Sequence, residues 1–191
     1  MDEALLFLKL GLDHVLEWEA YDHILFLIVL AIVYTVFDWK KVIGLITLFT
    51  LGHTLTLALS AYRILNIDVN IVEFLIPVTI MITAIVNILT MKRNQNTNIN
   101  LGLSFFFGTV HGLGFSTYFK MIIEDTDAKL LPLFHFAIGI EIAQILMVLL
   151  ILIFTYIAQG VFKISKQNWV LFISVIVIVI VIPMLIDRKF W

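Results

Sequence analysis

Long apolar runs separated by short polar connections most limit how this chain can fold. A helix needs about 20 mostly apolar residues to cross ~30 Å of hydrocarbon, and the runs here are close to that length. Inside a membrane every backbone N–H and C=O needs a partner within the protein, and a helix supplies these partners within one segment. Since 62% of the 191 residues are hydrophobic and 14% are charged, the sequence predicts an all-α integral membrane protein.

The runs predict about six transmembrane helices in one bundle, preceded by a short amphipathic N-terminal helix. Residues 4–18 alternate apolar and charged side chains at helical spacing, which is typical of a helix lying at the membrane interface. The connections are too short for a second domain, so residues 1–191 are expected to form a single transmembrane helical domain. The expected spans are Tyr21–Phe37, Val42–Ala61, Val69–Met91, Leu101–Ile122, Leu131–Ile157 and Trp169–Ile186.

The distribution of charge predicts an orientation and excludes one class of partner. One side of the membrane carries paired bases in every loop and the other side is heavily acidic; the bases are Lys40, Lys41, Lys92, Arg93, Lys163 and Lys166. The positive-inside rule assigns the basic side to the cytoplasm and the N-terminus to the outside. A net charge of -2 and basic runs of at most two residues argue against a nucleic-acid partner. Membrane lipid is the expected surrounding, and the sequence leaves the oligomeric state open.

Three ionisable residues fall in the middle of apolar runs, where a charge is costly and usually marks an ion path, a proton relay or a ligand site. His53 and His111 lie 11 and 10 residues into their runs, so both are expected ~15 Å deep. Glu141 reaches a similar depth from the opposite face. Without cysteine, thiolate ligands are excluded. Two imidazoles and a carboxylate predict a site for a divalent ion such as nickel, cobalt or zinc.

Other polar residues are expected near the outer ends of the spans. Asp22 and His23 begin the first span and are expected, with Glu73 and His135, to form an external mouth. His14, in the amphipathic segment, is a further candidate ligand and equally suits a wet interfacial position.

Asn87 follows Glu73 by two heptads, so the two side chains are expected on one side of their helix, within about 40° at ~100° per residue.

Each candidate also has a structural explanation. His53 and His111 could form hydrogen bonds between helices, and Glu141 could be a neutral, hydrogen-bonded side chain. Asp22 suits the first turn of a helix, because a negative charge is favourable there.

Small residues beside these polar groups predict close helix packing. Gly52 precedes His53, and Gly108 and Gly112 form a G-x-x-x-G pair around the position of His111. Glycine at such positions lets two membrane helices approach closely, so that side chains from different helices can share one ion.

Several motifs occur in series along the chain. They are G-x-x-H-x-L at Gly11–Leu16, D-H-I-L-F at Asp22–Phe26, F-T-L-G-H-T-L-T-L at Phe49–Leu57, H-G-L-G-F at His111–Phe115 and G-I-E-I-A-Q at Gly139–Gln144. In this order they resemble the HupE/UreJ membrane proteins. The resemblance implies a nickel or cobalt permease, or an accessory of metal supply to hydrogenase and urease, with the histidines and acids as metal contacts. It also suits a bacterial inner (cytoplasmic) membrane.

Transport of a divalent cation is therefore the function we expect, rather than catalysis. The alternative is an intramembrane zinc hydrolase, in which the same ligands hold zinc, an open position activates water and Glu141 or Asp22 acts as base. In a third interpretation His53 and His111 are the axial ligands of a haem. The sequence leaves the metal and the choice between transport and catalysis open.

Overall fold

The computed structural model describes residues 3–17, 21–92, 97–123 and 129–191, and for 97–99 it describes the backbone alone. Within these ranges the chain is helical and has no strand, which confirms the all-α prediction. The elements are α1 (Glu3–Leu16), α2 (Asp22–Ala31), the 3-10 turn η2 (Val36–Asp38), α3 (Trp39–Ala61), α4 (Val69–Thr90), α5 (Thr97–Ile122), α6 (Leu130–Gly160) and α7 (Lys166–Asp187).

Polar residues in the connections define where several helices begin. The Asp68 side chain accepts a 2.9 Å hydrogen bond from the backbone N–H of Asn70 and caps α4. Ser165 caps α7 in the same way, because the first N–H groups of a helix have no partner within it. Before α3, Thr35 and Asp38 form a capping box.

Four helices are long and apolar enough to cross a membrane: Val36–Ala61, Val69–Thr90, Leu130–Gly160 and Lys166–Asp187. They confirm four of the expected spans. The span expected over Tyr21–Phe37 is not one continuous helix, since α2 has only 10 residues and ends at Ala31. The fourth expected span lies in α5, which has 26 residues but is interrupted by polar and small side chains and is not among these four. Six crossings therefore remain a prediction.

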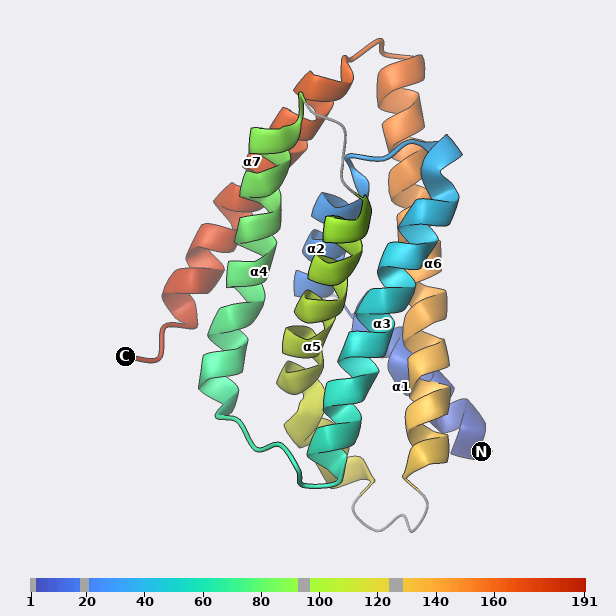
Figure 1. Cartoon of the computed structure of the whole chain (residues 1–191), viewed down its shortest axis with the longest axis vertical. Coiled ribbons are helices and arrows are strands. Elements are labelled where there is room, and N and C mark those ends of the chain that lie inside the picture. The colour runs from blue at the N-terminus through green and yellow to red at the C-terminus, as the bar shows by residue number, and fades with distance from the viewer. Residues whose placement is uncertain (1–2, 18–20, 93–96, 124–128) are drawn as a thin grey trace.

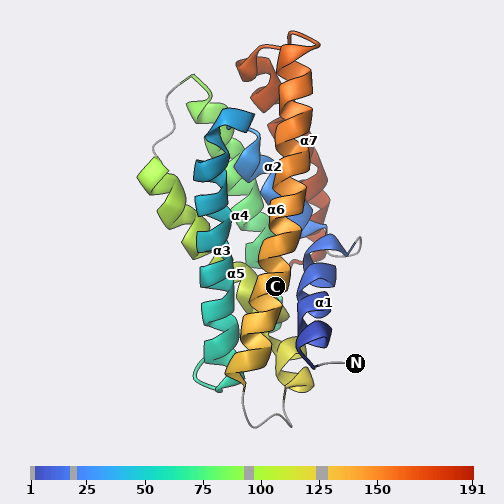
Figure 2. The same cartoon turned by 90° about the vertical axis from the view of Figure 1, so that its right-hand side faces the viewer.

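Helix α1 confirms the helix expected in residues 4–18, of which residue 18 lies outside the described residues. Both views show α1 along the lower part of the bundle beside α6, and α2 in the upper part among the longer helices (Figures 1 and 2). Phe7 and Val15 are buried, and Gly11 packs on the backbone of α6 next to Gly139. Two facing glycines let the backbones touch, so α1 lies against a long helix rather than alone at the surface.

Helices α3 and α5 also approach each other through glycine. A Cβ atom added at Gly108 would lie 3.0 Å from the Cα atom of Phe49, and one at Gly52 would lie 3.1 Å from the backbone N of Thr109. The hydroxyl of Ser104 donates a 2.7 Å hydrogen bond to the Leu45 carbonyl across the same interface. Lipid provides no hydrophobic drive between helices, so close packing and such hydrogen bonds hold them together. The close packing expected from the glycine pattern is confirmed.

Gly108→Ala should destabilise the protein, because the new methyl group would meet the backbone of Phe49, which has no room to move. Overpacking of this kind costs about 1–3 kcal/mol. Gly102→Ala on the same helix is the matched control, since a Cβ there meets nothing within 4 Å and alanine favours a helix by ~1 kcal/mol over glycine. Thermal unfolding of the purified protein in detergent measures both, and equal midpoints for the two variants would contradict the packing account.

Candidate metal centre

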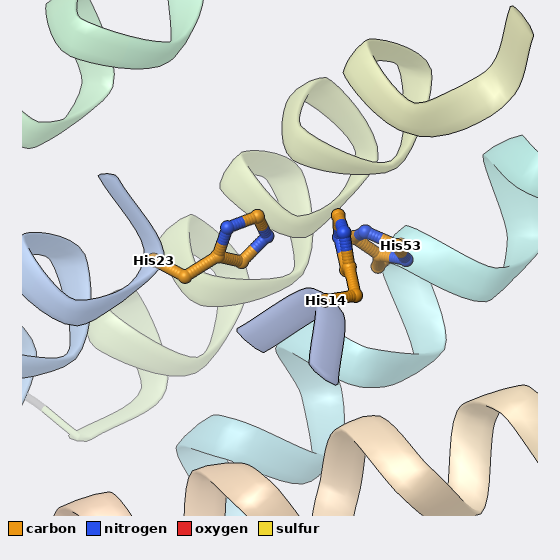
Figure 3. Close-up of side chains that lie close together, drawn as sticks. All are labelled: His14, His23 and His53. Atoms are coloured by element: carbon orange, nitrogen blue, oxygen red, sulfur yellow. The ribbon is translucent and has the colours of Figure 1, made fainter. Parts of the chain in front are cut away.

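Three histidines from three separate helices meet inside the bundle. His14, His23 and His53 each offer a ring nitrogen, and these three nitrogens lie within 4.8 Å of one another. Figure 3 shows the three rings directed toward a common space. The ring centroid of His14 is 4.5 Å from that of His23 and 5.5 Å from that of His53, and those of His23 and His53 are 6.2 Å apart. We call this group the histidine trio.

The trio forms where the N-terminal part of the chain changes from one helix to the next. His14 lies in the last turn of α1, which ends at Leu16, and His23 lies in the first turn of α2, which begins at Asp22. His53 comes from the middle of α3, one of the long apolar helices. The break between α1 and α2 therefore brings two imidazoles to the buried face of α3.

Four of the six ring nitrogens of the trio lack partners in the described part of the protein. His14 Nε2, His23 Nε2 and both nitrogens of His53 are buried without a hydrogen bond, although a buried polar atom left so costs about 1–3 kcal/mol. Unprotonated imidazole nitrogen is a common ligand of first-row divalent metals. The residues present therefore fit a metal ion, which would use the lone pairs that the protein leaves free.

Asp22 orients one ligand of the trio. Its Oδ1 atom lies 3.0 Å from His23 Nδ1, and because a carboxylate can only accept, the proton of the imidazole is on Nδ1. This leaves the lone pair of His23 on the unpartnered Nε2 atom. The other oxygen, Asp22 Oδ2, accepts a 3.2 Å hydrogen bond from Arg188 just beyond α7. A carboxylate behind a ligand histidine fixes the ring and raises its basicity.

His111 lies beside the trio, with its ring centroid 5.4 Å from that of His23. Its Nε2 atom is 3.1 Å from the Thr79 hydroxyl, which donates its own proton to the Ile76 carbonyl at 2.7 Å. Nε2 of His111 must therefore be the donor to Thr79, and its lone pair is on Nδ1, which is buried without a partner. A fourth imidazole, with one free nitrogen, thus lies next to the trio.

A cleft of ≈ 260 Å³ reaches three of these histidines, His14, His23 and His111. Its polar lining consists of His14, His23, His111, Arg188 and the acidic residues Glu17, Asp22 and Glu73. Glu73 is one turn inside the start of α4, and Arg188 directly follows the end of α7. The cleft therefore opens where α4 begins and α7 ends, and its acidic residues favour a cation.

The structure brings the predicted site residues together in a different grouping. We expected Asp22 and His23 at an outer mouth, apart from His53 and His111, but all four surround one site. The separation was wrong because the break between α1 and α2 brings His23 close to His53 of α3 and His111 of α5. His14 belongs to the trio and is not a wet interfacial side chain.

Three further candidates lie outside the trio. The Glu141 side chain contacts Thr47 and Thr50 on α3 and faces a separate groove. Asn87 donates to the Val29 carbonyl at 2.6 Å and lines another cavity. His135 is half-buried on α6 beside Phe134.

Arg188 is the residue of the site that the sequence did not indicate. It lies at the end of the last apolar run, where a basic residue normally marks only the membrane boundary. Its partner Asp22 is 166 positions away, and a pairing over that distance leaves no local pattern.

Comparison with known families agrees with this geometry. The sequence model of the HupE / UreJ protein family matches residues 1–188. The chain belongs to the HupE/UreJ family. This family is known for nickel- and cobalt-related accessory membrane proteins, and a histidine trio able to hold a metal ion suits such a role. Neither the curated proteins nor the solved structures contain a match to the chain.

Asp22→Asn should weaken metal binding about 10–100-fold, the usual effect of losing the partner behind a ligand histidine. An amide carries no charge, so it would support the His23 imidazole less and would lose the ion pair with Arg188. Calorimetric titration of the purified protein with Ni²⁺ measures this effect. Asp68→Asn is the control, because asparagine also caps helices and Asp68 lies outside the site. An unchanged affinity in D22N would contradict the role of Asp22.

Proposed function

We propose that the protein is a permease for a divalent transition metal, with nickel or cobalt as its substrate and the histidine trio as the binding site within the membrane. Membership of the HupE/UreJ family and the free nitrogens of the trio support this proposal. An all-imidazole site also accepts zinc, and the family is the reason to favour nickel and cobalt.

The observation that carries the proposal is a polar stripe along α4. Glu73 lines the cleft at one end of the helix, and Thr79 contacts His111 beside the trio. Thr83 and Asn87, each one turn further along, line a second cavity toward the opposite end of α4. Polar side chains thus lead from the cleft, past the histidines, toward the other membrane face. A permease needs such a route on both sides of its site, whereas an enzyme needs only one.

The second cavity extends the polar route. It lies between α2, α4 and α5, and its polar lining residues include Tyr34, Thr83, Asn87, Asn100 and Ser104. His111, which lies beside His23, contacts Thr79 and has a free Nδ1 atom, is the natural next ligand for an ion that leaves the trio.

The first crossing in this proposal consists of two half-helices. Helix α1 has 14 residues and α2 has 10, so at ~1.5 Å per residue the pair covers about 36 Å, enough for ~30 Å of hydrocarbon. Transporters commonly bind substrate where a membrane helix is discontinuous. With α5 as a further span, this arrangement retains the six predicted crossings.

The proposed direction of transport is uptake. With the basic loops on the cytoplasmic side, the acidic cleft near Glu73 faces outward and the cavity near Asn87 faces the cytoplasm. The N-terminus then lies outside a bacterial cytoplasmic membrane. Acidic residues in the cleft would raise the local concentration of a divalent cation before it meets the histidines.

The geometry favours transport over the zinc hydrolase. Both oxygens of Asp22 are already engaged, one by His23 and one by Arg188. Glu141 lies in another groove. Neither proposed base is therefore free beside the trio. A haem held by His53 and His111 is also disfavoured, because the His23 ring contacts both histidines in the space a macrocycle would need.

His53→Ala should reduce the affinity for Ni²⁺ by more than the ~10–100-fold lost when a ligand merely loses its hydrogen-bond partner, because one of three imidazoles is removed. His135→Ala removes a histidine of the same chain from outside the trio and should bind like the parent protein. Equilibrium binding to the purified protein compares the two. If H53A binds nickel as tightly as the parent, or if stoichiometric zinc survives dialysis while nickel does not bind, the proposed permease is wrong.

Thr83→Val should slow nickel uptake without weakening nickel binding, because it removes a hydroxyl from the cavity beyond the trio and keeps the side-chain shape. One lost hydrogen bond of ~1–1.5 kcal/mol in the rate-limiting barrier corresponds to a fall of about five- to tenfold. The assay is initial uptake of nickel into proteoliposomes. Thr109→Val on α5 is the control, because both hydroxyls donate to a carbonyl of their own helix but Thr109 does not line this cavity. Equal uptake rates in the two variants would contradict a route for the ion past Thr83.

A further inference from the structure

A groove between α3 and α6 contains a polar group that the metal route does not use. Its walls are mainly apolar and include Leu51, Leu133, Phe134 and Ile138. Glu141 from the middle of α6 lines this groove, together with three threonines of α3 at helical spacing, Thr47, Thr50 and Thr54. Both helices are membrane-spanning candidates, so the groove faces hydrocarbon rather than water.

Among the described residues, Glu141 is held by hydroxyl groups and by no positive charge. Thr47 lies 2.6 Å from Oε1 of Glu141, and Thr50 is hydrogen-bonded to Oε2. Of the described residues that line the groove from α3 and α6, Glu141 is the one titratable side chain. His53 is one turn beyond Thr50 on α3 but belongs to the histidine trio. A carboxylate in such surroundings has nothing to balance its charge.

The Thr50 hydroxyl has more acceptors around it than it has protons to donate. The Thr50 hydroxyl has one proton, yet its oxygen lies within hydrogen-bond distance of three acceptors: the Ile46 carbonyl at 3.1 Å, Glu141 Oε2, and Gln144 Oε1 at 3.0 Å. Gln144 Nε2 is buried without a partner. Rotating the side-chain amide of Gln144 by about 180° would exchange its oxygen and nitrogen and supply one donor to Thr50. One contact then remains without a donor, and with Thr50 donating to the Ile46 carbonyl it is the contact of Glu141 with Thr50.

A proton on Glu141 completes the network. Oε2–H of Glu141 would donate to the Thr50 oxygen, the Thr50 hydroxyl would donate to the Ile46 carbonyl, and the Thr47 hydroxyl would donate to Glu141 Oε1. Every contact then has one donor and one acceptor. The neutral acid also avoids the cost of a charge that faces hydrocarbon.

We propose that Glu141, with Thr47 and Thr50, is an exchangeable proton site within the membrane, separate from the histidine trio and reached through the groove between α3 and α6. Helix α3 links the two sites, because Thr50 and His53 are one turn apart on it. Proton release from Glu141 would change the contacts of the helix that carries a metal ligand. The proton site itself does not depend on the proposed metal transport, because it can be detected without metal.

A hydrophobic carbodiimide tests this site in the full-length protein. A protonated carboxyl group adds across one C=N bond: its oxygen bonds to the central carbon and its proton moves to nitrogen, and the adduct rearranges to a stable N-acylurea with no atom lost. We expect dicyclohexylcarbodiimide to modify Glu141, as located by peptide mass spectrometry, and the modification to decrease as the pH is raised. Glu141→Gln should abolish it. Glu73, in the aqueous cleft, is the internal control and should react with a water-soluble carbodiimide instead.

Infrared spectroscopy supplies a second readout that needs no reagent to enter the groove. The parent protein should show the carbonyl band of a protonated carboxylic acid, and E141Q should lack it while keeping the parent's nickel affinity. The proposal is overturned if this band is the same in both proteins, or if sodium chloride, but not choline chloride, blocks carbodiimide labelling at fixed pH, because the site would then take Na⁺. Loss of nickel binding in H53A leaves these outcomes unchanged, so the two proposals fail separately.

Discussion

Buried imidazole nitrogens without hydrogen-bond partners are the constraint on which the function of this fold depends. A protein normally satisfies such atoms, because each unsatisfied one costs about 1–3 kcal/mol. Here several of them gather at one place from three helices. Asp22 and Thr79 accept the N–H groups of His23 and His111, so the free lone pairs of these two rings are on known atoms. A bound cation is the simplest way to satisfy the cluster.

The rest of the bundle makes this arrangement possible. Glycines at the contacts of α3 with α5, and of α1 with α6, bring backbones together where larger side chains would hold them apart. The break between α1 and α2 places His14 and His23 at helix ends inside the protein. Arg188 then ties the end of α7 to Asp22. Burying these polar side chains in a membrane costs free energy. Close backbone packing and the hydrogen bonds among the polar side chains keep them in place.

Much of this could be predicted from the sequence, for identifiable reasons. Run length and composition predict the long spans, because the hydrocarbon thickness sets the length of an apolar helix. The glycine pattern predicts close packing, and the cost of a buried ionisable group singles out Asp22, His23, His53 and His111. The sequence does not predict which way a side chain points around its helix axis, or where a helix breaks, because both depend on tertiary contacts. For that reason depth counting separated His23 from His53 and grouped Glu141 with the histidines, whereas the structure does the opposite.

X-ray absorption spectroscopy of the nickel-loaded protein reports which atoms surround the metal. A metal held by the histidine trio should show a nitrogen shell with the scattering pattern of several imidazoles, and fewer imidazoles after substitution of His14, His23 or His53 by alanine. A shell of oxygen atoms alone, or a spectrum that none of these three substitutions changes, would contradict metal binding by the trio.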